Sequence, residues 1–154
     1  MRLTVDIEIN RPKEDVWKVI TDIENSADFI SAVEKIEIVE KPDKGLKGTK
    51  WIETRMMLGR ELNDKVIISD VTDNESYTAQ ADSYGAMHSA KLSLKTVGDM
   101  TKLAVEFEVI PLAINTKIAF FVLRFFVKAH IKKTLQNEVL DIKRFTEKML
   151  NRRE

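Results

Sequence analysis

Three turns in the middle of the chain determine how five strands can pair. Turn-forming residues stand at Gly59–Arg60, Asp73–Asn74 and Gly98–Asp99, each between two segments in which polar and apolar residues alternate. Alternation with a period of two is typical of strands, and a two-residue loop sets which residues lie opposite each other. In all three hairpins the apolar residues of both strands then share one face, which a shift of one residue would destroy. The sequence therefore predicts an antiparallel meander.

The turns also predict specific neighbours across the strands. Counting outward from each two-residue loop assigns every position a partner on the next strand. The opposed pairs are Met57 with Leu62, Arg55 with Asp64, Glu53 with Val66, Trp51 with Ile68, Ile68 with Ala79, Val66 with Ala81, Leu94 with Leu103, Leu92 with Val105, Ala90 with Phe107, and His88 with Val109.

The segments on either side of the meander complete the predicted order of elements. Residues 2–10 alternate as a half-buried strand does, Pro12 suits the first turn of a short helix, a second helical turn is expected over 24–32, and a strand lies near 33–40. After Pro111 the chain is predicted to be helical to near its end. The core stripe of that helix, with members three or four residues apart, is Phe120, Leu123, Val127, Ile131, Leu135, Val139, Ile142, Phe145 and Met149.

The first half of the long helix is apolar on every side. Residues 118–127 read IAFFVLRFFV. Ten residues at about 1.5 Å each are too short to cross roughly 30 Å of hydrocarbon, so we expect no membrane span. Whether the helix is continuous, breaks near residues 112–118 or bends further along stays open. A second apolar face, opposite the core stripe, consists of Ile118, Phe121, Val122, Phe125 and Ala129.

This second face needs a neighbour, because the solvent-facing side of a helix is normally polar and here carries five apolar residues. The neighbour is a closing loop, another subunit, a ligand or a bilayer surface. Peripheral membrane contact and a homodimer are therefore both open as roles for Ile118, Phe121, Val122 and Phe125.

Composition argues against several classes of function. Lysine plus arginine equals aspartate plus glutamate at 25 each, so no broad basic field attracts nucleic acid. The chain has no cysteine and two histidines, so we expect no metal site and no cofactor. The cysteine-free composition and the alternating start, MRLTVDIEIN, favour a cytoplasmic protein without a signal peptide. A length of 154 residues predicts one domain, 1–154.

The order of elements, with VWKVITDIENSADFISAVEKIEI at 16–38 and GTKWIETRMMLGRE at 48–61, resembles the START-like polyketide cyclase/dehydrase and lipid-transport superfamily, often called SRPBCC. The resemblance covers essentially the whole chain. It implies an α+β helix-grip fold, a curved seven-stranded antiparallel sheet wrapped around a long C-terminal helix, with two short helices between strands one and two. It also implies a hydrophobic cavity between sheet and helix. It implies no particular reaction, because this fold carries binders, transfer proteins and enzymes.

The register and the helical stripe predict which side chains line such a cavity. Most are apolar, and three are alanines that either leave a void or let the helix come close. The predicted ligand-binding residues are Trp51, Glu53, Arg55, Met57, Asp64, Val66, Tyr77, Ala79, Ala81, His88, Ala90, Phe107, Phe120 and Val127.

The polar members of this set allow two interpretations. Arg55 opposite Asp64, with Glu53 beside it, could form a two-pronged ion pair that orients the polar end of a ligand. Alternatively, this end of the hairpin lies in solvent, where such a pair contributes little. His88 could transfer a proton, but nothing in the sequence places Tyr77 or either carboxylate near it, so no catalytic residue is assigned and His88 is only a candidate.

The sequence thus predicts the binding of a hydrophobic or amphipathic small molecule, such as a lipid, an isoprenoid or a polyketide-like compound. Binding by apolar burial requires a cavity of at least about 300 Å³. No nucleophile elbow, glycine-rich phosphate loop or paired-carboxylate motif indicates an enzyme. The alternatives are an enzyme of the cyclase, aromatase or dehydrase type and a module that docks onto a protein or a membrane.

Overall fold

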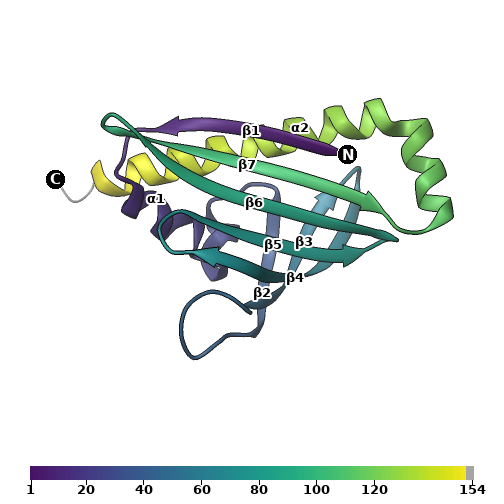
Figure 1. The fold of residues 1–154 in the computed structure, drawn as a ribbon, viewed down its shortest axis with the longest axis horizontal. Helices are drawn as coiled ribbons and strands as arrows, with labels where there is room; N and C mark the ends of the chain where they lie inside the picture. The colour runs from purple at the N-terminus through teal and green to yellow at the C-terminus, as the bar shows by residue number, and fades with distance from the viewer. Residues whose placement is uncertain (152–154) are drawn as a thin grey trace.

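The computed structural model describes residues 1–151, in which seven strands form one antiparallel sheet in the order β1-β7-β6-β5-β4-β3-β2 (Figure 1). The predicted order of elements and the helix-grip fold are confirmed. In chain order the elements are β1 (Arg2–Ile9), α1 (Lys13–Ile20), the 3-10 helix η1 (Ile23–Asp28), β2 (Val33–Glu40), β3 (Lys50–Met57), β4 (Arg60–Thr72), β5 (Ser76–Ser83), β6 (Ala86–Val97), β7 (Met100–Pro111) and α2 (Ile114–Asn151).

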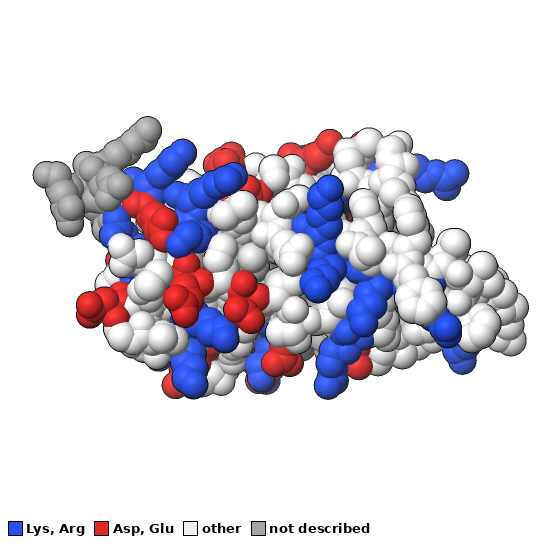
Figure 2. Space-filling view, turned by 90° about the horizontal axis from the view of Figure 1, so that it is seen from above, with Lys and Arg blue, Asp and Glu red and all other residues white. Residues whose placement is uncertain are grey.

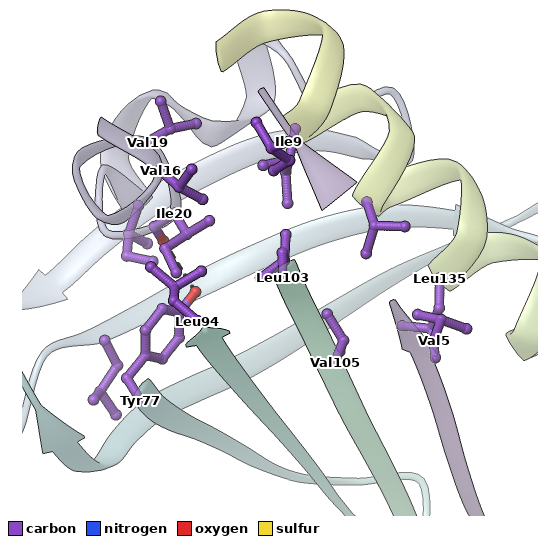
Figure 3. Close-up of a cluster of buried hydrophobic side chains, with 14 of the residues drawn as sticks. Val5, Ile9, Val16, Val19, Ile20, Tyr77, Leu94, Leu103, Val105 and Leu135 are labelled. Carbon is purple, nitrogen blue, oxygen red and sulfur yellow. Dashed lines mark hydrogen bonds between the residues drawn. The ribbon is translucent and has the colours of Figure 1, made fainter. Parts of the chain in front are cut away.

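The hydrophobic core lies where α1, the sheet and the second half of α2 meet (Figure 3). Pro12 precedes the first turn of α1, and Glu14 and Asp15 occupy that turn, where the positive end of the helix dipole favours them. The opposite side of α1 carries apolar residues that point into the core. Fully or nearly fully buried core residues include Ile9, Val16, Ile68, Leu103, Val139 and Ile142.

The predicted pairing is confirmed in two of the three hairpins. Every predicted pair between β6 and β7 is present. Between β4 and β5, Ile68 faces Ala79 as predicted, although the loop is one residue longer, because Thr72 faces Ser76. An irregularity between Ile68 and Asp70 restores the predicted register further from the turn, as a β-bulge does.

The predicted register of the β3–β4 hairpin is wrong by two residues. Arg55 lies opposite Leu62, Glu53 opposite Asp64 and Trp51 opposite Val66. The loop consists of Leu58 and Gly59, both with positive φ (50° and 75°), which is the pattern of a type I′ turn and not of a turn at Gly59–Arg60. Because a shift of two residues keeps each side chain on its face, the inner face is as predicted and only the partners change.

α2 is unbroken from Ile114 to Asn151 and bends, so that its first turns lie at a steep angle to the rest (Figure 1). The predicted core stripe is buried or half-buried from Val127 to Phe145. Leu123 is 50% exposed and Met149 is 41% exposed, so placing them in the core was wrong. The first half of the helix extends beyond the hydrophobic core, so Leu123 is not buried in it.

Polar contacts also fasten the second half of α2 to the end of β1. Lys143 Nζ donates to the Glu8 carbonyl oxygen at 2.7 Å and to Glu147 Oε1 at 2.7 Å. Glu147 also accepts a hydrogen bond from the backbone N–H of Asn10 at 3.0 Å. Burial alone would raise the pKa of Glu147, but these hydrogen bonds and the nearby positive charges outweigh it and lower the pKa.

Among the described residues, no helix is both long enough and apolar enough to pass through a bilayer.

Two leucines of the predicted stripe test the difference between the halves of α2. Leu135 is 7% exposed and Leu123 is 50% exposed. We expect Leu135→Ala to lower the free energy of unfolding by about 2–3 kcal/mol, since it removes buried apolar contacts. Leu123→Ala should change it by less than about 0.5 kcal/mol. Urea unfolding followed by circular dichroism measures both, and equal losses would contradict the exposed position of Leu123.

Candidate functional site

A cavity of about 460 Å³ lies between α2 and the inner face of the sheet. Its volume exceeds the roughly 300 Å³ that a small-molecule site needs. Ala79, Ala81 and Ala90 all border it, so the small side chains leave a void and the close-packed alternative is wrong.

All of the side chains predicted to bind a ligand border this cavity, from Trp51 on β3 to Val127 on α2. The alternation along each strand brings them to one wall, and the helical stripe supplies the facing wall. That they bind a ligand stays a prediction.

Further residues that border the cavity were not predicted from the sequence. They come from α1, η1, the loop after η1, the first residue of β2 and α2. The signal for most was their apolar periodicity, which was interpreted only as core packing. These residues are Val19, Ile20, Ile23, Phe29, Ile30, Val33, Ile131, Leu135, Glu138, Val139 and Ile142.

A charged cluster occupies the cavity wall at β3. Arg55 forms ion pairs with Glu53 of the same strand and with Glu138 of α2, and the three side chains are 25%, 15% and 16% exposed. Trp51 Nε1 donates a hydrogen bond to Glu53 Oε2 at 3.1 Å. The charged residues therefore border the cavity, and their placement in open solvent is wrong.

The predicted ion pair between Arg55 and Asp64 is replaced by pairs with the two glutamates. The register shift places Glu53, and not Arg55, opposite Asp64. Asp64 Oδ1 is buried and has no hydrogen-bond partner among the described residues. Helical spacing places Glu138 beside the core stripe, three residues after Leu135, but its pairing with Arg55 depends on how α2 is rotated over the sheet.

Electrostatics keep Arg55 charged and Tyr77 neutral. Burial lowers the pKa of Arg55, but the negative charges of Glu138 and Glu53 and their hydrogen bonds outweigh it, so the pKa is raised. Burial, followed by the same two negative charges, raises the pKa of Tyr77. The Tyr77 hydroxyl donates to the Ile20 carbonyl oxygen at 3.0 Å, which fixes the phenol against α1.

His88 borders the cavity from β6, between Ala81 of β5 and Val109 of β7. Its ring centroid lies 6.2 Å from that of Phe107. Within residues 1–151 no hydrogen bond reaches the imidazole, and no group of three or more acidic or histidine side chains could hold a metal ion. The described residues thus supply His88 with no acid or base to orient it.

A curved antiparallel sheet that grips a long helix around a mainly apolar cavity defines a helix-grip protein. The chain belongs to the polyketide cyclase/dehydrase and lipid-transport family, whose model matches residues 1–139. The fold of this family implies a hydrophobic ligand-binding cavity. No curated protein sequence matches the chain.

Solved structures share the fold at low sequence identity. A protein of Thermus thermophilus is 14% identical with a TM-score of 0.80, over 95% of this chain and 97% of that one. The Zhui aromatase/cyclase of a Streptomyces species is 14% identical with a TM-score of 0.77, over 97% and 95%. A START superfamily protein of Mycobacterium smegmatis is 15% identical with a TM-score of 0.64, over 88% and 97%. These likenesses show the fold alone.

Replacing Arg55 tests the charged cluster. Arg55→Met leaves two carboxylates that are 15% and 16% exposed without their cation. We expect the free energy of unfolding to fall by about 2–3 kcal/mol, somewhat less than for a fully buried pair. Arg2 is the matched control, because its side chain is 71% exposed and pairs with Glu108 at 3.4 Å. Arg2→Met should cost at most about 1 kcal/mol in urea unfolding, and equal costs would contradict a stabilising role for Arg55.

Proposed function

We propose that the chain, as one domain working in the cytoplasm, binds a hydrophobic or amphipathic small molecule such as a lipid, an isoprenoid or a polyketide-like compound. The observation that carries this proposal is the cavity of about 460 Å³, whose wall is mainly apolar. Burial of apolar ligand surface there would contribute roughly 25 cal/mol per Å². The absence of cysteine from the sequence supports the proposed compartment.

A cyclase or aromatase reaction is the second candidate, favoured by the neighbours described as aromatase/cyclases. Such a reaction needs an acid or base positioned at the substrate. His88 is the cavity's imidazole, yet the described residues give it no hydrogen-bonded partner, and Tyr77 is bonded to a backbone carbonyl. The geometry therefore supports binding better than catalysis.

Native mass spectrometry of the purified protein, followed by solvent extraction, tests ligand binding. We expect a retained apolar compound, or uptake of the neutral dye Nile red if the protein is purified empty. Ala79→Phe should reduce either signal at least tenfold, because the ring fills part of the cavity bordered by Ala79.

Ala104→Phe is the control for this substitution. Ala104 lies on β7 opposite Asp6 and Ser93 and does not border the cavity. The variant should therefore retain the compound, or take up Nile red, as the wild type does. An empty wild-type protein that takes up no dye would contradict the proposal.

We further propose that the polar end of the ligand donates hydrogen bonds. The Arg55 guanidinium is already paired with Glu53 and Glu138, which argues against its serving as an anchor for a ligand carboxylate. Carboxylate oxygens accept several hydrogen bonds, and Asp64 Oδ1 has no partner among the described residues. Leaving such a group unpaired costs about 1–3 kcal/mol, so a ligand hydroxyl or ammonium group would relieve that cost.

Displacement of Nile red by dodecanol, dodecylamine and dodecanoate measures this preference. We expect the alcohol and the amine to bind at least about tenfold more tightly than the carboxylate. Asp64→Asn should narrow the difference in affinity between these two ligands and dodecanoate, because the amide side chain can also donate a hydrogen bond. Asp70→Asn, at an exposed position of the same strand, should leave it unchanged. Tighter binding of dodecanoate by the wild type would refute the donor preference without affecting cavity binding.

We propose that the exposed face of α2 at Ile118, Phe121, Val122 and Phe125 is the surface of contact, with either a membrane or a second copy of the chain.

A further inference from the structure

The beginning of α2 carries an unusual concentration of exposed apolar side chains. We call residues 112–126 the apolar segment. Soluble monomers rarely expose apolar patches larger than a few hundred Å², and larger ones mark interaction sites. Within the apolar segment the large apolar residues that are at least half exposed are Leu112 (52%), Ile114 (77%), Ile118 (61%), Phe121 (71%), Val122 (70%), Leu123 (50%), Phe125 (76%) and Phe126 (61%).

Charge around the apolar segment has one sign. Residues 112–137 contain Lys117, Arg124, Lys128, Lys132 and Lys133 and no aspartate or glutamate, although the whole chain carries 25 charges of each sign. Figure 2 looks down on this side of the molecule. One end is largely uncharged and carries blue lysine and arginine side chains, whereas most of the red aspartate and glutamate side chains lie toward the other end.

Three of the basic residues lie together beside the apolar surface. Lys117, Arg124 and Lys128 are seven and four residues apart and therefore share one side of α2. The Arg124 guanidinium lies over the rings of Phe121 and Phe125, 5.0 Å and 4.9 Å from their centroids, so its charge is held among the exposed rings. An apolar face bordered by cations is the pattern of helices that lie in a membrane interface.

From this pattern we propose that the apolar segment docks onto the surface of an anionic lipid bilayer. The apolar side chains would enter the boundary between headgroups and acyl chains, and the cations would meet lipid phosphates, each contributing about 1 kcal/mol near such a surface. A second copy of the chain fits less well. In a two-fold dimer the same surface patch meets itself, and residues 112–137 offer no aspartate or glutamate to pair with the cations of the other copy.

Docking would also bring the bilayer close to the ligand cavity. Phe120 and Val127 border the cavity from the same stretch of α2 whose other side is exposed. Tyr84 borders the cavity and is 64% exposed, and the turn that contains it is attached to the chain just before α2, because Leu112 and Ala113 donate backbone hydrogen bonds to Gly85 at 2.8 and 3.2 Å. A docked α2 thus separates the bilayer from the cavity by one helix. A ligand could then pass between the bilayer and the cavity. This passage of a ligand rests on the proposed function, whereas docking itself does not.

Co-sedimentation with lipid vesicles tests the proposal. The wild type should bind vesicles that contain phosphatidylglycerol more tightly than pure phosphatidylcholine vesicles, and the preference should weaken as salt rises. Phe121→Ser with Phe125→Ser should weaken binding at least tenfold, because both rings are more than two-thirds exposed and available to lipid. Replacing Lys117, Arg124 and Lys128 with glutamine should lower affinity for the anionic vesicles about a hundredfold and remove most of the preference.

Met56→Ser with Leu58→Ser is the matched control, since these residues are 48% and 68% exposed apolar side chains at the β3–β4 turn. This control should bind vesicles as the wild type does. All variants should keep the wild-type circular dichroism spectrum, because the replaced side chains lie on the surface.

Three results would overturn the proposal. The first is a wild type that fails to bind anionic vesicles at low salt, and the second is a control pair that loses as much binding as the phenylalanine pair. The third is a dimer, seen by light scattering, that dissociates in the phenylalanine variant while vesicle binding is absent. Native mass spectrometry of the same variant keeps the two proposals apart, because a variant that loses vesicle binding but keeps its bound compound supports docking by the apolar segment and leaves the proposed ligand binding unaffected.

Discussion

The packing of the second half of α2 against the sheet is the contact on which the rest of the structure depends. Leu135, Val139 and Ile142 are buried against the core, and Lys143 and Glu147 fasten the helix to the end of β1. These contacts set the height of the helix above the strands. Because the side chains beneath it at Ala79, Ala81 and Ala90 are small, that height leaves a cavity instead of a filled core.

The same helix carries the charged residue that connects the two walls of the cavity. Glu138 follows Leu135 by three residues, so the packing that buries Leu135 also turns Glu138 toward Arg55 of β3. Removing charges from water is costly, and the pairs with Glu53 and Glu138 offset that cost for Arg55. The cluster is therefore both a link between sheet and helix and the polar end of an otherwise apolar space.

The two halves of α2 differ both in their composition and in what surrounds them. The stripe of apolar residues continues from Phe120 to Phe145, but the core lies only under its later part. Before Val127 the helix has exposed apolar residues on several sides and only basic charges. Such a segment is unfavourable in water, which is the physical reason to expect a partner surface there.

The sequence by itself determined which face each strand residue occupies. Alternation and turn residues are local, so the order of elements, the pairs between β6 and β7 and most of the side chains that β3 to β7 present to the cavity could be predicted. The β3–β4 partners could not, because positive φ at Leu58 moved the turn by one residue and the register by two. Only the tertiary structure decided that Arg55 pairs with Glu138, that a void forms and that Leu123 is exposed. These features depend on the position and rotation of α2 over the sheet, which the packing of many distant side chains sets together.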